Sequence, residues 1–372
     1  MRLAILGHFP FDAPARGGIQ SVIASLRDEL GRDASIDLHL IQHRQGIPEG
    51  GYERPGYTVH NFAARPSRLA PNMMRTAGLV APLLRQLAPD AISTHQYEYA
   101  LPALDSGRPT VHTIHGFPGK ELSTRRTWFT RLASLWELWL ERQTLRRVRH
   151  IVAISNHVIE LYRPRTQAQF HRVNNPVAPL FFEPSPPPEP NRLLFVGNIT
   201  PRKGLEVAIA AVGRLQPDFP GLLFEIIGAT ADPAYADALH RQAAPLGDAV
   251  RFRGSPPQAE IKEALGRAQA LVLTSFDEHA PVIVAEAMAA GRAVAATAVG
   301  ALPDMVEPGV TGYLAPPGNP EAVAQNLARL LSDPDHAAAL GAEAGRRARD
   351  LYHPAAVARG YVQALAAAMA GD

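Results

Sequence analysis

Two glutamates stand eight positions apart in FDEHAPVIVAEAMAAG, residues 276–291. The segment follows the apolar run ALVLTS, which predicts a buried strand, and Pro281 suits the first position of a helix over PVIVAEAMAA. Glu278 then lies in the strand-to-helix loop and Glu286 lies inside the helix, so the two carboxylates do not share a helical face. We expect them to contact different parts of one ligand.

The predicted helix start is suited to an anion. Amides around Ala280, Pro281 and Val282, at the positive end of the helix dipole, favour a phosphate. Glu286, one to two turns further in, then reaches a sugar hydroxyl attached to that phosphate, and Glu278 faces the other end of the ligand. The alternative is that both glutamates only satisfy the helix dipole.

A second strand-to-helix loop carries two cations. In FVGNITPRKG, residues 195–204, Arg202 and Lys203 come just before a helix that begins near Gly204. Cations and backbone amides at one strand end suit a diphosphate. The loop lacks the Walker A pattern. An arginine-lysine pair on solvated surface is the alternative.

Glycines follow the first predicted strand. Gly17 and Gly18 precede an amphipathic helix, where they permit close approach of the backbone to a ligand. The fingerprint G-x-G-x-x-G is absent, which argues against a nicotinamide enzyme. A plain turn is the alternative.

A histidine ends another predicted strand. His115 closes PTVHTIH and is followed by a glycine-proline loop, a good place for a hydrogen bond to substrate. His112 and His95 compete for that role, and a structural histidine is the alternative.

Apolar runs alternate with helix-period segments in both halves of the chain, which predicts two parallel α/β domains. We expect an N-terminal domain over 1–182, a proline-rich linker over 183–190, a C-terminal domain over 191–350, and a helix over 351–372 that can pack back on the first domain. The predicted strands are residues 2–7, 36–41, 57–62, 90–95, 110–115 and 150–155, and then 192–197, 222–228, 249–254, 270–275 and 292–297.

Composition narrows the classes of function. The chain has 372 residues, of which 46% are hydrophobic and 19% charged, and it has no cysteine, which excludes disulfides and thiolate chemistry. It lacks an apolar run long enough to span a membrane and a recognisable signal peptide, so a cytoplasmic location is expected. Lys and Arg exceed Asp and Glu by 22 to 15 before residue 186, but they are dispersed, which disfavours nucleic acid.

The four loops that carry the glutamates, the cations, the glycine pair and His115 all follow the carboxyl ends of predicted strands. In this arrangement the chain resembles the retaining GT-B glycosyltransferases of family 4 over nearly its whole length. The strongest match is the E-x7-E signature at Glu278 and Glu286, within FDEHAPVIVAEAMAAGRAVAATAVGALPDMVEPGVTGYLAPPG. The segments GGIQ, HTIHG, VAISNHV, NNPV, VGNITPRKG and FEIIGA support it in order. The resemblance implies two Rossmann-like doubly wound domains that face a central cleft.

The resemblance also implies roles. Glu286 would hold the donor ribose, Glu278 the hydroxyls of the transferred sugar, and His115 would support that sugar near its anomeric carbon. Retention would follow from front-face attack, in which the leaving phosphate removes the acceptor proton. The function implied is transfer of a hexose from a nucleotide sugar to a saccharide or lipid-linked acceptor, in bacterial polysaccharide or glycolipid assembly.

The diphosphate of a UDP- or GDP-linked sugar would be bound by Arg202 and Lys203, helped by backbone amides at Gly17, Gly18 and the start of the helix at 281. No metal and no further cofactor is expected, because cationic side chains would bind the diphosphate and neutralise its charge, as a metal ion does elsewhere. The one D-x-D, Asp333-Pro334-Asp335, is interpreted as a helix cap.

Two departures from the family pattern bear on the donor. Asn198 stands where the family often has arginine, and His279-Ala280-Pro281 replaces the common Gly-Phe-Gly after the first glutamate. Two alternatives stay open: a sugar-nucleotide epimerase or phosphorylase of the same fold, and an inactive glycosyltransferase-like binding subunit, which Asn198 makes conceivable.

The acceptor side is expected in the N-terminal domain. Residues 123–150 are helical in period and contain all three tryptophans and seven arginines. Such a helix can rest on the inner membrane as a peripheral contact, or it can pack on the N-terminal sheet. Lys120, Arg125 and Arg126 would lie free at its entrance.

Overall fold

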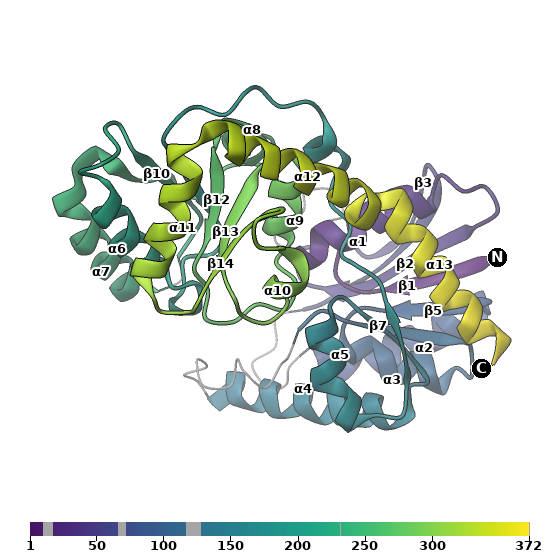
Figure 1. Ribbon diagram of the computed structural model, residues 1–372. Helices are drawn as coiled ribbons and strands as arrows, with labels where there is room; N and C mark the ends of the chain where they lie inside the picture. Colours follow the sequence, from purple (N-terminus) through teal and green to yellow (C-terminus); the bar gives the residue numbers. More distant parts are fainter. Residues whose placement is uncertain (10–17, 66–71, 117–127, 231, 372) are drawn as a thin grey trace. The chain divides into compact units, whose positions relative to one another are not determined.

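The computed structural model describes residues 1–9, 18–65, 72–116, 128–230 and 232–371 (Figure 1). It divides into two compact units. The first comprises Met1–Pro176 together with Pro354–Asp372, and the second comprises Val177–His353. No helix among the described residues is both long and apolar enough to cross a membrane.

The first unit is built on an eight-stranded sheet in which every neighbouring pair is parallel except the first. Its inner strands are almost wholly buried, as expected for apolar runs covered on both faces. In sheet order the strands are β3 (Gly50–Arg54), β4 (Tyr57–Ala63), β2 (Asp37–Arg44), β1 (Arg2–Leu6), β5 (Ala91–Thr94), β6 (Thr110–Ile114), β7 (His150–Ala153) and β8 (Gln169–Arg172).

Helices cover both faces of this sheet. Ile92 of β5 packs in a core cluster with residues of α2 and α3, whereas the next residue, Ser93, points to α13 on the opposite face. The helices of the first unit are α1 (Gly18–Leu30), α2 (Met73–Leu87), α3 (Tyr97–Asp105), α4 (Trp128–Arg147), α5 (Asn156–Tyr162), the short 3₁₀ turn η2 (Arg163–Arg165) and α13 (Pro354–Ala370).

The second unit has a six-stranded, all-parallel sheet around one large apolar core. In sheet order its strands are β11 (Val250–Phe252), β10 (Leu223–Ile227), β9 (Arg192–Val196), β12 (Ala270–Leu273), β13 (Ala293–Thr297) and β14 (Gly312–Ala315). Its helices are η3 (Pro179–Phe182), η4 (Pro201–Lys203), α6 (Leu205–Leu215), α7 (Pro233–Ala243), η5 (Ala244–Ala249), α8 (Gln258–Arg267), α9 (Val282–Ala289), α10 (Leu302–Met305), α11 (Pro320–Ser332) and α12 (Pro334–Tyr352).

All eleven predicted strands form, within a few residues at their ends. Three further strands, β3, β8 and β14, were not predicted. β3 (GGYER) and β8 (QFHR) lie at sheet edges and are largely polar, and β14 (GYLA) is a short edge strand, so none carries a strong hydrophobic signal. The predicted class, two Rossmann-like α/β domains, is confirmed.

The proline-rich segment is held against the second unit. Its backbone carbonyls at Pro184 and Pro186 accept hydrogen bonds from Lys262 and Arg292, at 3.1 and 2.7 Å. Phe181, just before it, is buried in the core of that unit. The second unit therefore begins at Val177, earlier than the linker predicted at 183–190, because the apolar side chains of 177–182 belong to its core.

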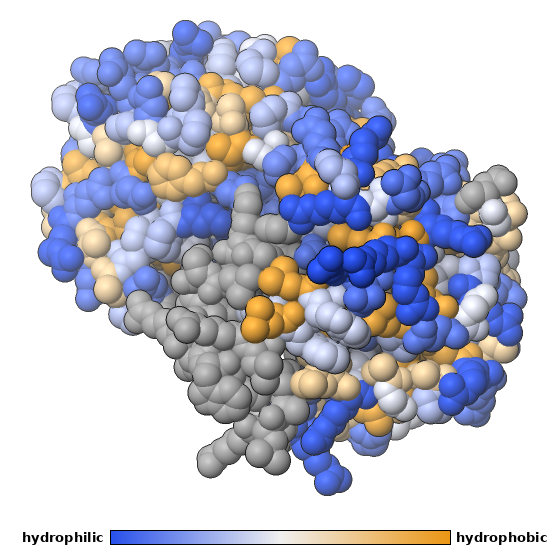
Figure 2. Space-filling model, turned by 90° about the horizontal axis from the view of Figure 1, so that it is seen from below, coloured by the Kyte–Doolittle hydropathy of each residue, from blue (hydrophilic) through white to orange (hydrophobic). Residues whose placement is uncertain are grey.

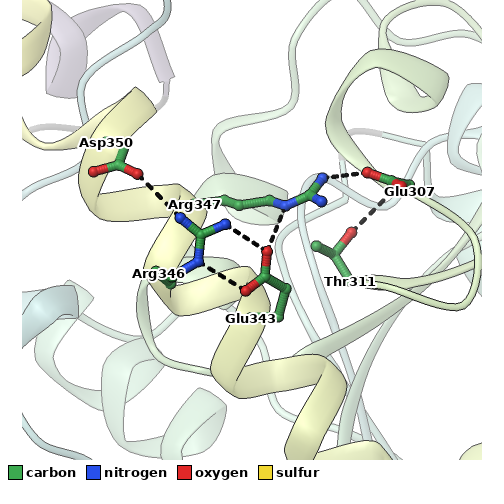
Figure 3. A network of polar contacts seen from close by, with 6 residues as sticks. All are labelled: Glu307, Thr311, Glu343, Arg346, Arg347 and Asp350. Carbon is green, nitrogen blue, oxygen red and sulfur yellow. Dashed lines mark hydrogen bonds and ion pairs between the residues drawn. The ribbon is translucent and has the colours of Figure 1, made fainter.

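An ion-pair network fastens α12 to the turn before β14 (Figure 3). Arg347 pairs with Glu343 on its own helix and with Glu307 across the turn, where Glu307 also donates its amide to Thr311 at 2.9 Å. Arg346 pairs with Glu343 as well. These arginines hold the pKa of Glu343 low, at about 2.

Close backbone contact joins the loops that follow β9 and β12. Gly204 has φ +58°, and a Cβ there would overlap the carbonyl oxygen of Thr274. The Thr274 hydroxyl donates to the carbonyl of Gly204 at 2.8 Å, and the amide of Phe276 donates to the carbonyl of Arg202 at 2.9 Å. Only glycine permits this approach.

We therefore expect Gly204→Ala to lower the free energy of unfolding by at least about 2 kcal/mol, through both left-handed strain and overlap. Gly221 also has positive φ, +77°, but a Cβ there meets nothing within 4 Å. Gly221→Ala is the matched control and should cost only about 1 kcal/mol. Urea titration measures both, and equal losses would contradict the close approach.

Candidate active site

Glu278 lies five residues after the end of β12, and its carboxylate contacts the two cations Lys203 and Arg202. Its Oε1 accepts from Lys203 Nζ at 2.5 Å and from the Ser275 hydroxyl at 2.7 Å. Its Oε2 lies 3.6 Å from Nη1 of Arg202. The carboxylate is 4% exposed, and two cations and one hydroxyl compensate its burial.

Arg202 and Lys203 reach this carboxylate from η4, the turn between β9 and α6. Arg202 is anchored by donating to the carbonyl of Asp277 at 2.8 Å, yet about half of its side chain stays exposed. Lys203 is buried, at 9% exposure. The structure therefore brings together three residues that the sequence placed in two loops, and it leaves Arg202 the more accessible cation.

Glu286 lies apart from these cations on α9. The helix begins at Val282, with Pro281 as its N-cap at ψ 113°, so the prediction that Pro281 is the first helical residue was wrong by one position. By helix geometry, the amides of Val282 and Ile283 lack partners within the helix, whereas the amide of Val284 donates to the carbonyl of Pro281 at 3.1 Å. Ala280 and Pro281 lead directly into this turn, as the sequence indicated.

The carboxyl of Glu286 is 9% exposed. Burial raises its pKa to about 7, and a hydrogen bond from the side chain of Gln258, the first residue of α8, opposes that rise. Glu278 has paired cations, whereas Glu286 has a neutral amide as its partner. Glu286 is thus poised between a protonated and an ionised state near neutral pH.

This raised pKa predicts how stability depends on pH. Between its ordinary value of 4.5 and about 7, the folded protein keeps a proton on Glu286 that the unfolded chain has lost. Its contribution is therefore complete below pH 4.5 and is lost as the pH rises through 7. In Glu286→Gln the side chain is neutral at every pH, so this loss of stability at high pH should disappear.

Denaturant titrations at about pH 5 and about pH 8.5 measure the effect. From the lower pH to the higher one, the free energy of unfolding of Glu286→Gln should rise by roughly 2–3 kcal/mol relative to that of wild type. Glu343→Gln is the control, because arginines lower the pKa of that half-buried residue and its contribution is already nearly complete at pH 5. An equal difference between Glu286→Gln and wild type at both pH values would contradict the assignment.

In the first unit, His115 follows β6 and is half-buried. Its Nε2 lies 2.8 Å from Nδ1 of His95, and the two rings stack with centroids 5.1 Å apart. Burial lowers the pKa of His115 to about 4, so the imidazole is neutral at pH 7. A neutral ring with one nitrogen held by His95 can offer the other to a ligand.

The competing histidines take other places. His112 is 1% exposed, its Nδ1 lies 2.7 Å from the Thr94 hydroxyl, and its ring packs on Tyr97. His95 is also buried and lies behind His115. Of the three, His115 is the most accessible to a ligand.

Several predicted residues cannot be placed in this geometry. Gly17, Lys120, Arg125 and Arg126 lie outside the described residues. Gly18 is the first residue of α1. Among the described residues, no group of three or more His, Asp or Glu side chains is arranged to hold a metal ion.

Asp333, of the predicted helix cap, is the N-cap of α12 and accepts from the amide of His336 at 2.9 Å, which confirms that prediction.

Three contributors were missed by sequence reasoning: Ser275, Gln258 and Tyr361. Ser275 could have been found, since it ends the predicted strand three residues before Glu278. Gln258 and Tyr361 carry no local signal, because each forms a hydrogen bond with a residue from a different part of the chain. Gln258 bonds to Glu286, and the Tyr361 hydroxyl lies 3.1 Å from Nε2 of His95.

Comparison with known proteins identifies the family of the chain. Residues 178–347 match the family model described as glycosyl transferases group 1, and residues 16–179 match the model described as glycosyltransferase family 4. The chain belongs to this glycosyltransferase family. The boundary between the two matches falls close to the division between the two units.

Among curated members of the family, the chain is 32% identical over 275 residues to a D-inositol 3-phosphate glycosyltransferase from Thermobispora bispora. That match covers 68% of this chain and 64% of the relative, so the chain spans less than two thirds of the relative's length.

Solved structures show the same GT-B fold. Sucrose-phosphate synthase from Thermosynechococcus elongatus superposes with a TM-score of 0.81 at 20% identity, covering 100% of both chains. The Anabaena protein HepE, in complex with UDP-glucose, superposes with a TM-score of 0.74 at 18% identity, covering 99% of this chain and 100% of that one.

Proposed function

We propose that this protein transfers a hexose from a nucleoside diphosphate sugar to a saccharide or lipid-linked acceptor, with retention of anomeric configuration. The supporting observation is the cluster of Arg202, Lys203 and Glu278 at the strand ends of the second unit, in a chain of this family. The setting proposed is bacterial polysaccharide or glycolipid assembly, in the cytoplasm.

The donor binds the second unit in this proposal. Arg202, which is half exposed, contacts the diphosphate first, and the first amides of α9 complete that contact. Lys203 then moves from the Glu278 carboxylate to the phosphate, which leaves Glu278 free to accept hydrogen bonds from the transferred sugar. Glu286 accepts from the ribose hydroxyls. The ion pair thus keeps both groups compensated until the donor replaces each partner.

His115 supports the reacting sugar through its neutral imidazole, and the departing phosphate takes the acceptor proton. No metal is part of this proposal. UDP is the first nucleotide to test, because the HepE structure contains UDP-glucose. GDP is the alternative that the sequence leaves open.

Thermal melting and titration with UDP, GDP, ADP and their sugars test the donor site. Stabilisation by one nucleoside diphosphate is expected, since a ligand at 100 times its Kd adds about 2.7 kcal/mol. Release of that nucleotide only when an acceptor is added supports transfer. Turnover of the donor without acceptor would instead support an epimerase, and binding without turnover a binding subunit.

The division of roles gives a sharper prediction. Glu286→Gln should weaken binding of the free nucleotide about 10- to 100-fold, because it removes a charged acceptor for the ribose. Glu278→Gln should lower kcat about 100-fold or more and leave nucleotide affinity equal or tighter, because Lys203 is released from its partner. Isothermal titration and initial rates separate the two, and identical behaviour would sink this assignment.

A peripheral membrane contact is proposed for α4. Its buried side includes Leu140, Thr144 and Leu145. Its exposed side carries Leu135, 60% exposed, and Trp139, 45% exposed. Arg142 and Arg146 continue the same exposed stripe at helical spacing. Figure 2 views the protein from below, the side on which Figure 1 draws α4, and shows hydrophobic and strongly hydrophilic residues close together there. Two apolar side chains followed by cations suit an anionic lipid surface.

Co-sedimentation with vesicles tests this contact. Leu135→Glu/Trp139→Glu should reduce binding to vesicles containing anionic lipid at least about 5-fold, because it removes apolar area and adds repulsion. Leu351→Glu is the matched control, since Leu351 is 44% exposed on α12 of the second unit. Equal binding by the double variant and the control would rule out α4 as the contact.

A further inference from the structure

The buried face of α13 carries a tyrosine hydroxyl into the polar cluster behind His115. Tyr361 is 1% exposed and comes from the last helix of the chain, which packs on β5, β6 and β7 of the first unit. Its hydroxyl lies 3.1 Å from Nε2 of His95, on the opposite side of that ring from His115. The ring planes of Tyr361 and His95 are nearly parallel, at 7°.

Two more hydroxyls surround that of Tyr361. The Thr113 hydroxyl lies 2.8 Å away, and Ser93 is also hydrogen-bonded to it. Ser93 approaches Nε2 of His95 as well, but only at 3.3 Å. Tyr361 is therefore the hub of the cluster and the nearer hydroxyl to His95.

All of these groups are neutral at pH 7. Burial lowers the pKa of His95 well below its usual range and that of His115 to about 4, while it raises the pKa of Tyr361 to about 12. Each neutral imidazole carries one N–H and one acceptor nitrogen. The hydrogen bonds along Tyr361, His95 and His115 must therefore all run in one direction.

The phenol decides that direction. A phenolic O–H is more acidic than the hydroxyls of serine and threonine, and an imidazole nitrogen is the best neutral acceptor in the cluster. Tyr361 accordingly donates to Nε2 of His95. The proton of His95 is then on Nδ1, from which it is donated to Nε2 of His115.

We propose that Tyr361 is a positioning residue for His115: through His95 it fixes the ring and places the single His115 proton on Nδ1. This inference rests on the proposed function, in which His115 supports the sugar. His115 then presents Nδ1–H as a donor toward oxygen atoms of the ligand. The last helix of the chain would thereby complete a site that begins at the end of β6.

Histidine tautomers can be measured without any substrate. Two-bond ¹H–¹⁵N correlation spectra of ¹⁵N-histidine-labelled protein distinguish Nδ1–H from Nε2–H, and His115→Gln identifies the His115 signals. We expect His115 in the Nδ1–H form in wild type. In Tyr361→Phe, which keeps the ring but removes the donor, its population should shift toward Nε2–H.

Tyr99→Phe is the matched control for this spectrum. Tyr99 is fully buried in the same unit, but its hydroxyl bonds to His43, outside this cluster. It should leave the His115 signals unchanged. Finding Nε2–H at His115 in wild type would overturn the proposal, even if Tyr361→Phe failed to fold, and so would an unchanged pattern in a folded Tyr361→Phe.

Kinetics provide the second readout. Tyr361→Phe should lower kcat for transfer about 10-fold while the Kd for nucleoside diphosphate, bound by the second unit, stays the same. An unchanged kcat with a shifted tautomer would overturn the positioning role. If no donor is turned over at all, the proposed function fails, whereas the spectra still decide whether Tyr361 sets the tautomer.

Discussion

The candidate donor site depends on one constraint, which is that the backbone of neighbouring loops must touch at the carboxyl edge of the second sheet. Gly204 lies against the carbonyl of Thr274, Gly228 against that of Gly197, and Gly300 against that of Glu278. In each case a Cβ would overlap a backbone carbonyl. Because parallel strands end at the same edge, these contacts bring together side chains from loops far apart in sequence.

Charge at this edge is handled in two ways. Glu278 is buried with Lys203 and near Arg202, so its charge is balanced within the protein. Glu286 is buried beside a neutral amide, and its pKa rises instead. A ligand with several hydroxyls and a diphosphate complements this pattern. Its hydroxyls can donate hydrogen bonds to the two carboxylates, and its diphosphate can pair with the arginine and the lysine.

Sequence reasoning found the parts of the site but not their contacts. Strand and helix periodicity correctly placed Glu278 in a loop and Glu286 in a helix, because buried strands such as β12 are continuous apolar runs. The pairing of Lys203 with Glu278, 75 positions apart, depends on sheet order, which periodicity does not encode. The contact of Tyr361 with His95 was not predicted for the same reason, since α13 reads only as an alanine-rich helix.

The position of α13 also governs the order in which the chain can fold during synthesis. The second unit is continuous, from Val177 to His353, so its whole sequence is translated before that of α13. The first unit lacks α13 until residues 354–370 emerge, and until then one face of β5, β6 and β7 lacks its cover. The domain that is translated first is thus the last to be completed, and a chain stopped short of Pro354 would leave that surface open to aggregation.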